Sequence, residues 1–482
     1  MKSLCKLTLL IAFMGMYCLQ LTLSHAQTGK RFFTGDNTGK NEFDMLSRPA
    51  ERATRDMQNL PPAVSLKQYA PIPGNQGKHG TCVAWSTSYA ARTISYCIQR
   101  RITDQAQIMS NAFSPGYLYY NVKQAGDADC IGGANIENAL RVLAAKGDLL
   151  KSDNIPDCVT AIDNGTDGKA KNYAIKAYTR LSESYGSVAK NEISTIKKSL
   201  AENKPVVLSM KCMNSFFSVG SDGIWNLKPT DVNQGNHAMC IVGYDDNKLG
   251  GAFEVINSWG TTWGNKGFFW LTYQQMQQYG NYVVEMMDRE AEQAEIKGSI
   301  DFILLGGSSM PVTRTKITTR SISVEDDEKA DYSSYRLSEN YPGGTAFKIK
   351  FTTNAPAFVY IFSVDDKNVV SKLFPYADGI SPAINSADAT VYLPSESKHA
   401  RLSNDPGSEK ICVLYSKSPL DFNWLMSSIT QAPSKMYETI MAAYQNQLIP
   451  VKNVSFGNDK ISFSTKAEEK QMVCFFIDLN HK

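Results

Sequence analysis

The chain has 482 residues, enough for two domains, and 43% of them are hydrophobic, enough to pack a core in each. The formal net charge of +3 is nearly balanced, so composition gives no reason to expect nucleic acid as a partner. The sequence has no Cys-x-x-Cys pair and no clustered histidines, and we expect no metal or other cofactor.

Residues 1–26 have the pattern of a signal peptide. Two lysines precede an apolar run over residues 7–21, and Ser24-His25-Ala26 provides the small residues of a cleavage site. We therefore predict a mature chain that begins near Gln27 and is secreted, periplasmic or located at the cell surface. No later stretch reaches the roughly 18 apolar residues that cross a bilayer, so we predict no stable membrane insertion.

Residues 27–59 are polar and charged, with only scattered apolar positions. This composition predicts a loose N-terminal extension or short propeptide. A short segment of this kind could still block a cleft.

Residues 60–290 form the first predicted domain. Apolar and small residues recur at helical spacing over residues 82–100, 135–146 and 192–203. After Pro205 the pattern changes to short runs of branched and aromatic residues, which are typical of strands, over residues 206–210, 239–244, 253–256 and 267–272. A helical half followed by a sheet half predicts an α+β fold with a cleft between the halves.

Four residues of this domain have the chemistry of acyl transfer by a thiol. Cys82 begins the first helical run, where helix N-terminal amides and a nearby imidazolium would lower the pKa of its thiol. His237 would take the thiol proton and later give it to the leaving amine, and Asn257 would hold the imidazole in the required tautomer. The side-chain amide of Gln76, with the backbone N–H of Cys82, could stabilise the oxyanion. A lone cysteine in an apolar helix is usually a core residue, but the four together predict a nucleophile.

The same blocks resemble the papain family of cysteine peptidases, in its bacterial and secreted form. The family pattern of Gln, five residues and Cys is met by Gln76 and Cys82, and its His-Ala strand by His237-Ala238. Its block Asn-Ser-Trp-Gly-x-x-Trp-Gly is complete from Asn257 to Gly264. The resemblance implies a papain-like two-lobed fold and an endopeptidase that hydrolyses peptide or protein substrates through a Cys thioester acyl-enzyme.

The resemblance also implies four substrate-binding residues. Gly132 and Gly133, in a Cys-x-Gly-Gly block, would let a substrate backbone lie close and exchange main-chain hydrogen bonds, although a Gly pair can also simply form a turn. Trp259 would shield the hydrogen bond between His237 and Asn257 from water. Ala238 would line the pocket for the second residue before the cut, which we expect to be roomy and apolar.

Departures from the family pattern keep other interpretations open. Val83 follows Cys82 where the family usually has Trp, and His79 replaces the cysteine that normally bonds to Cys130. Cys158 is then the nearest available partner, although sequence does not assign connectivity. The alternatives are a weakly active or inactive papain scaffold that binds a ligand, and a peptide ligase or amidase that uses the same site.

A charged linker over residues 288–295 separates a second predicted domain, residues 296–482. Short strand candidates dominate it, so we predict an all-β, sandwich-like accessory domain, interrupted by helical spacing over residues 421–448. Gly343-Gly344-Thr345 and Leu373-Phe374-Pro375, on either side of a strand, resemble a domain of unknown function in exported bacterial proteins. Such a domain could bind a cell surface, a carbohydrate or a protein.

Overall fold

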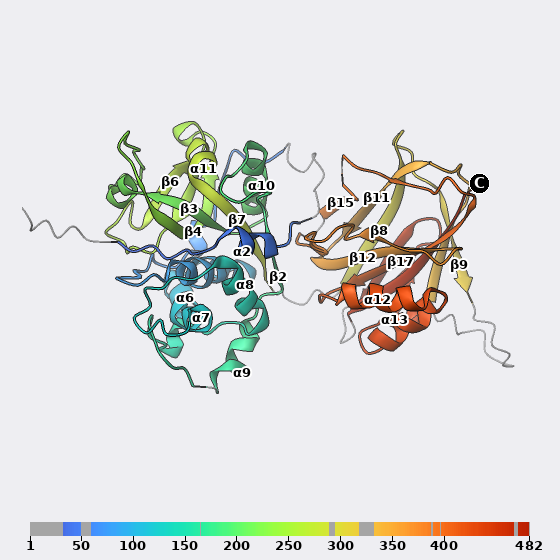
Figure 1. The fold of residues 1–482 in the computed structure, drawn as a ribbon, viewed down its shortest axis with the longest axis horizontal. Coiled ribbons are helices and arrows are strands. Elements are labelled where there is room, and N and C mark those ends of the chain that lie inside the picture. The colour runs from blue at the N-terminus through green and yellow to red at the C-terminus, as the bar shows by residue number, and fades with distance from the viewer. Residues whose placement is uncertain are drawn as a thin grey trace, which may run out of the picture.

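The computed structural model describes residues 32–49, 59–163, 165–288, 295–317, 332–386, 389–395, 397–466 and 471–481. The predicted signal peptide lies outside these residues. The described chain forms two bodies (Figure 1). The first contains helices and one antiparallel sheet, and the second consists mainly of strands. Within the described ranges, no helix combines the length and the apolarity that a bilayer crossing requires.

The predicted helices of the first body are confirmed. The run from Cys82 to Arg100 is one continuous helix with a π-helical middle, and most of its first three turns are fully buried, which explains why small and apolar residues dominate there. Figure 1 shows α6 to α9 gathered below the strands of the sheet. The helices are α4 (Cys82–Ala84), η2 (Trp85–Arg92), α5 (Thr93–Arg100), α6 (Gln105–Ser110), α7 (Pro115–Val122), α8 (Ile136–Ala145), α9 (Thr166–Ala170), α10 (Lys190–Ala201) and α11 (Tyr273–Tyr279).

The sheet of the first body has the strand order β2-β7-β3-β4-β5-β6, with β1 paired to β4. All its pairs are antiparallel, and the register of β3 with β4 places Met210 opposite His237 and Ser209 opposite Ala238. Four of these strands match the predicted runs, whereas the fully buried β7 was not predicted. The strands are β1 (Ala63–Ser65), β2 (Ala177–Arg180), β3 (Val206–Met213), β4 (Asn233–Asp245), β5 (Ala252–Ile256), β6 (Phe268–Thr272) and β7 (Gly280–Met287).

The described part of the N-terminal extension, residues 32–49, packs against the first body. Its helix α2 (Lys40–Met45) buries Phe43, whose ring lies 5.9 Å from that of Tyr185 and 5.4 Å from that of Tyr282. Leu46 is also fully buried. The prediction of a loose extension is therefore wrong for residues 32–49, because Phe32, Phe43 and Leu46 pack against the first body, although Met45 stays exposed.

The second body contains two sheets whose apolar faces contribute to one hydrophobic core. Helices α12 (Phe422–Gln431) and α13 (Met436–Tyr444) confirm the predicted helical interruption and cover the other face of the larger sheet. The larger sheet contains β9 (Val312–Ile317), β10 (Tyr332–Leu337), β12 (Ala357–Asp365), β13 (Val370–Phe374), β14 (Ala383–Ile384), β17 (Gly407–Ser416) and β20 (Met472–His481). The other contains β8 (Glu295–Leu304), β11 (Ala346–Thr353), β15 (Ala389–Leu393), β16 (Ala400–Arg401), β18 (Val454–Phe456) and β19 (Ile461–Lys466).

A loop of the second body, residues 377–386, contacts the first. Asn385 donates from Nδ2 to the buried carboxylate of Glu285 on β7 at 2.8 Å. The backbone of Arg48, at the end of the N-terminal segment, exchanges hydrogen bonds with Gly379 and Ser381 at 2.7 and 2.6 Å. The two bodies and the N-terminal segment therefore share one contact region.

Candidate active site

Cys82 begins the long helix and is fully buried. The backbone N–H groups of Ala238, Gly35 and Val83 lie close enough to the sulfur to lower its pKa. The contact with Ala238 places the sulfur beside the strand that carries His237. The fold thus brings together two residues that are more than 150 positions apart in the sequence.

The orientation of Asn257 fixes the tautomer of His237. Asn257 Oδ1 accepts the backbone N–H of Ser258 at 2.7 Å, so the atom that faces His237 Nε2 at 2.8 Å is an oxygen. An oxygen only accepts, so Nε2 must carry the ring proton, which leaves Nδ1 as the free base. Nδ1 is buried and makes no hydrogen bond. The pair has the arrangement that a general base and its orienting residue require.

Gln76 has its side chain fixed at both ends. Its Oε1 accepts from the Ser258 hydroxyl at 2.6 Å, which turns the Nε2 group toward the cleft. Nε2 donates to the carbonyl of His79 at 2.8 Å and to the carbonyl of Phe33 at 3.0 Å. A peptide carbonyl therefore already occupies the donor that sequence analysis assigned to the oxyanion.

Trp259 covers the hydrogen bond between His237 and Asn257. Its ring stacks on the imidazole with centroids 4.6 Å apart and is itself only 2% exposed. The ring therefore lies where it would keep water from this hydrogen bond, the role that the family resemblance implies. The indole Nε1 also donates to the carbonyl of Phe33 at 3.2 Å, and the ring of Phe32 stacks on the opposite side at 4.7 Å.

Of the two predicted glycines, Gly133 is the one whose missing side chain is needed. Its φ is +77°, and an added Cβ would lie 2.6 Å from both Gly35 O and Asn37 Nδ2. The next residue, Ala134, donates to Gly35 O at 2.9 Å and accepts from the Asn37 N–H at 2.8 Å. Gly132 contributes its carbonyl, which accepts from Asn37 Nδ2 at 2.5 Å. The close backbone approach expected for a substrate is made here by the chain's own N-terminal segment.

Residues 32–38, which we call the blocking segment, thus cross the whole site. The segment begins on Trp259, passes Gln76 and Cys82, and pairs in parallel with Ala134 through Asp36. Sequence analysis did not identify these contacts. The available signal was Phe32-Phe33-Thr34-Gly35-Asp36, an aromatic pair followed by Gly in an otherwise polar stretch.

Burial beneath the blocking segment keeps Cys82 and His237 uncharged. Burial raises the pKa of Cys82 to about 12, with a further increase from the Asp36 carboxylate, and the three backbone N–H groups only partly oppose this. Burial also lowers the pKa of His237 to about 4, although the hydrogen bond with Asn257 opposes the change. At neutral pH both groups are therefore neutral, and the thiolate that acts as nucleophile is absent from the closed site.

A disulfide joins Cys130 to Cys158, the partner that sequence analysis named as nearest but could not assign. The carbonyl of Cys130 accepts from the N–H of Gly80 at 2.8 Å. The bridge therefore anchors the turn before Gly132 close to the loop that precedes Cys82.

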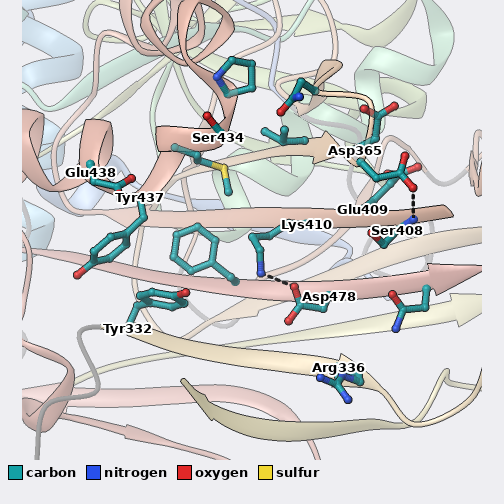
Figure 2. Close-up of a pocket in the computed structure, with 17 residues that line it drawn as sticks. Tyr332, Arg336, Asp365, Ser408, Glu409, Lys410, Ser434, Tyr437, Glu438 and Asp478 are labelled. Atoms are coloured by element: carbon teal, nitrogen blue, oxygen red, sulfur yellow. Dashed lines mark hydrogen bonds and ion pairs between the residues drawn. The ribbon is translucent and has the colours of Figure 1, made fainter. Parts of the chain in front are cut away.

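A hollow of about 600 Å³ lies in the C-terminal body, away from Cys82, between α13 and the strands β10, β12, β17 and β20 (Figure 2). Lys410 forms an ion pair with Asp478, and the Ser408 N–H donates to Asp366 at 3.2 Å. The carboxylates that line it outnumber its two cations, so the hollow carries net negative charge. The charged lining residues are Arg336, Lys410, Asp365, Asp366, Glu409, Glu438 and Asp478.

Comparison with known families gives two matches. Residues 66–287 match the family described as "Papain family cysteine protease", and residues 340–419 match a domain of unknown function, DUF4384. Together the matches follow the division of the described chain into two bodies.

Similar proteins agree with the first match. They include an uncharacterised peptidase C1-like protein of Acanthamoeba polyphaga mimivirus, 28% identical over 214 residues, which are 41% of this chain and 63% of the relative. A cysteine endopeptidase, RepA, of Oryza sativa subsp. japonica is 26% identical over 44% of this chain and 52% of its own length. Cathepsin L of Sarcophaga peregrina is 24% identical over 46% of this chain and 61% of its own.

Among solved structures, xylellain, a cysteine protease from Xylella fastidiosa, is 22% identical with a TM-score of 0.44, over 54% of this chain and 96% of that chain. The matches to the three curated relatives span between about half and two thirds of their length. Over residues 66–287 the chain contains a cysteine peptidase domain of the papain family, followed by a domain of the DUF4384 family.

Proposed function

We propose that the protein is a cysteine endopeptidase that hydrolyses peptide bonds in peptides or proteins. His237 Nδ1 takes the proton of Cys82, and the thiolate attacks the scissile carbonyl carbon. The oxyanion forms at Gln76 Nε2 and the backbone N–H of Cys82. His237 returns the proton to the leaving amine, and water then hydrolyses the thioester.

One observation supports this proposal most directly. A peptide carbonyl, that of Phe33, already accepts from Gln76 Nε2 in a cleft that Cys82, His237 and Asn257 also border. The same cleft therefore has the shape and the donors to hold a peptide backbone. This argument is independent of the family match.

We also propose that residues 27–59 act as a short propeptide that keeps the enzyme latent. The blocking segment occupies the donor of Gln76 and buries the sulfur. Removing or displacing the segment would admit water and substrate together and restore conditions in which the thiolate forms.

The wider organisation completes the proposal. The signal-peptide pattern of residues 1–26 supports export, from a bacterial cell by the family resemblance. The peptidase body would be two-lobed, with Cys82 on the helical lobe and His237 on the sheet lobe. The C-terminal body would be a β-sandwich accessory domain that binds a cell surface, a carbohydrate or a protein.

The test uses the full chain with the Gly35→Ala substitution, which is designed to displace the blocking segment, and the same chain with Cys82→Ala added. We expect the first to cleave a peptide mixture and to react with an epoxide probe at Cys82, as peptide mapping of the adduct would show. The Cys82→Ala protein should do neither. Cys97→Ala, which removes another buried thiol of the same helix, is the matched control and should retain both activities. Turnover by the Cys82→Ala protein would refute the assignment, and mass spectrometry of the products would separate hydrolysis from ligation.

A further inference from the structure

The side chain of Asp36 is buried against the peptidase sheet, and we call the position that it occupies the Asp36 pocket. Asp36 is only 4% exposed, and its carboxylate accepts a short hydrogen bond from the hydroxyl of Ser209 on β3. Asn281, at the start of β7, donates to the same hydroxyl at 3.2 Å. The pocket thus lies between two strands of the peptidase sheet, and polar groups form its floor.

Tyr282 adds a further polar group that has no partner. Its hydroxyl is fully buried and makes no hydrogen bond, yet it lies close enough to Asp36, Thr38 and Ser209 for these groups to shift its pKa. A buried hydroxyl without a partner is unfavourable. The Asp36 carboxylate therefore leaves one buried donor beside it unused.

The pocket offers donors but no positive charge. Burial raises the pKa of Asp36, and hydrogen bonds from Ser209 and Thr38 oppose this. Thr38 belongs to the blocking segment, so Ser209 is the donor that the pocket itself supplies. No lysine or arginine of the described chain is among the groups that shift this pKa. The pocket therefore suits an oxygen acceptor, whether the side chain is a carboxamide or a carboxyl group.

A substrate side chain would reach the same place. Ser209 pairs with Ala238 across β3 and β4, and Ala238 is the residue that the family resemblance assigns to the pocket for the second residue before the cut. Asp36 pairs with Ala134, the residue that follows Gly132 and Gly133 at the edge where a substrate backbone is expected to bind. Because side chains alternate along an extended strand, a peptide bound to this edge in either direction directs one side chain into the pocket.

We propose that this pocket selects substrates with a short acceptor side chain, Asn or Asp, as the second residue before the cut. The inference rests on the proposed peptidase function and replaces the roomy apolar pocket expected from sequence. The Ser209 hydroxyl donates its proton to the Asp36 carboxylate, and an apolar side chain would leave that donor without an acceptor. Sites built to hydrogen-bond a group reject analogues that lack it. We expect a preference for Asn or Asp over Leu of at least about tenfold.

The first arm of the test requires no turnover. In the full chain, Asp36→Asn, Asp36→Ala and Asp36→Leu are compared by the rate at which iodoacetamide alkylates Cys82. Asn should protect Cys82 at least as well as Asp, whereas Leu and Ala should raise the rate about tenfold or more. Asp36→Ala removes the acceptor without adding bulk, so it separates the loss of the hydrogen bond from a steric clash. Lys40→Leu, at an exposed position of α2 just after the blocking segment, is the control. Equal protection by Leu and Asp would overturn the proposal.

The second arm uses the full chain with Gly35→Ala and fluorogenic peptides that carry Asp, Asn, Leu, Phe or Arg as the second residue before the cut. Asn and Asp should give the highest kcat/KM, and Tyr282→Phe and Ser209→Val should reduce that preference while Leu peptides gain. Preferred cleavage after Leu or Phe at that position would overturn the pocket assignment. If the first arm discriminates as expected but no peptide is cleaved, the peptidase proposal fails and the chemistry of the pocket stands.

Discussion

Gly35 is the position at which one methyl group should open the site. A Cβ added there would lie 2.0 Å from the carbonyl oxygen of Gly80 and 2.4 Å from its carbon. Both atoms are backbone in the loop before Cys82, so neither can rotate away, and ordinary contact begins at about 3.4 Å. Gly35→Ala must therefore push the blocking segment outward by roughly 1 Å or more.

A displacement of that size breaks the contacts that hold the segment. The carbonyl of Phe33 would leave hydrogen-bond range of Gln76 and Trp259, which it now meets at 3.0 and 3.2 Å. Overpacking together with lost hydrogen bonds costs about 2–4 kcal/mol. At about 1.4 kcal/mol per tenfold, the open population should rise about 30- to 1,000-fold.

The assay is the rate of alkylation of Cys82 in the native full chain, measured by mass spectrometry of the mapped peptide. Gly35→Ala should react faster than the parent by the factor above, up to the limit of a fully open site. Gly39→Ala is the matched control, because its added Cβ would meet only the flexible end of Glu42, at 3.0 Å. A Gly35→Ala protein that melts like the parent and is alkylated no faster would show that the segment does not control access.

Three further predictions follow from the same geometry. In the opened Gly35→Ala chain, Asn257→Ala should lower kcat by about 100-fold or more, because the imidazole loses the acceptor that fixes its tautomer; an unchanged kcat with intact folding would contradict the assigned role. Burial raises the pKa of Asp36, so the closed form is most stable at low pH, where the carboxyl is neutral, and loses stability as pH rises from the ordinary value of 3.8 through the raised one. The alkylation rate of Cys82 in the parent, divided by the rate in Asp36→Asn, should therefore rise between pH 4 and pH 7. The titration of the thiol affects both proteins equally and cancels in this ratio. A flat ratio would mean that the carboxylate is not buried in the closed form. Cys158→Ser should lower the free energy of unfolding by about 2–4 kcal/mol in urea titrations. Reducing agent should then destabilise the parent but not the variant, and an equal effect on both would place the bridge elsewhere.

Much of the peptidase body could be predicted from the sequence because its signals are local. The long helix from Cys82 and the helices α8 and α10 have apolar and small residues at helical spacing, and the strands β3 to β6 contain short runs of branched and aromatic residues. The order of Gln76, Cys82, His237 and Asn257 along the chain identified the candidate site before any distance was known. The fully buried β7 escaped prediction because Gly280, Asn281 and Glu285, residue types that are depleted in strands, flank and interrupt its apolar run.

Only tertiary structure decided how the cleft is filled. Residues 32–49 carry no periodic pattern, and their order comes from contacts with distant parts of the chain, such as Phe33 with Gln76 and Asp36 with Ser209. The polarity of the pocket beside Ala238 also depends on which residue β3 places opposite it, a matter of strand register. Local sequence determines which residues form helices and strands, whereas long-range pairing determines what lies against the nucleophile and therefore its pKa.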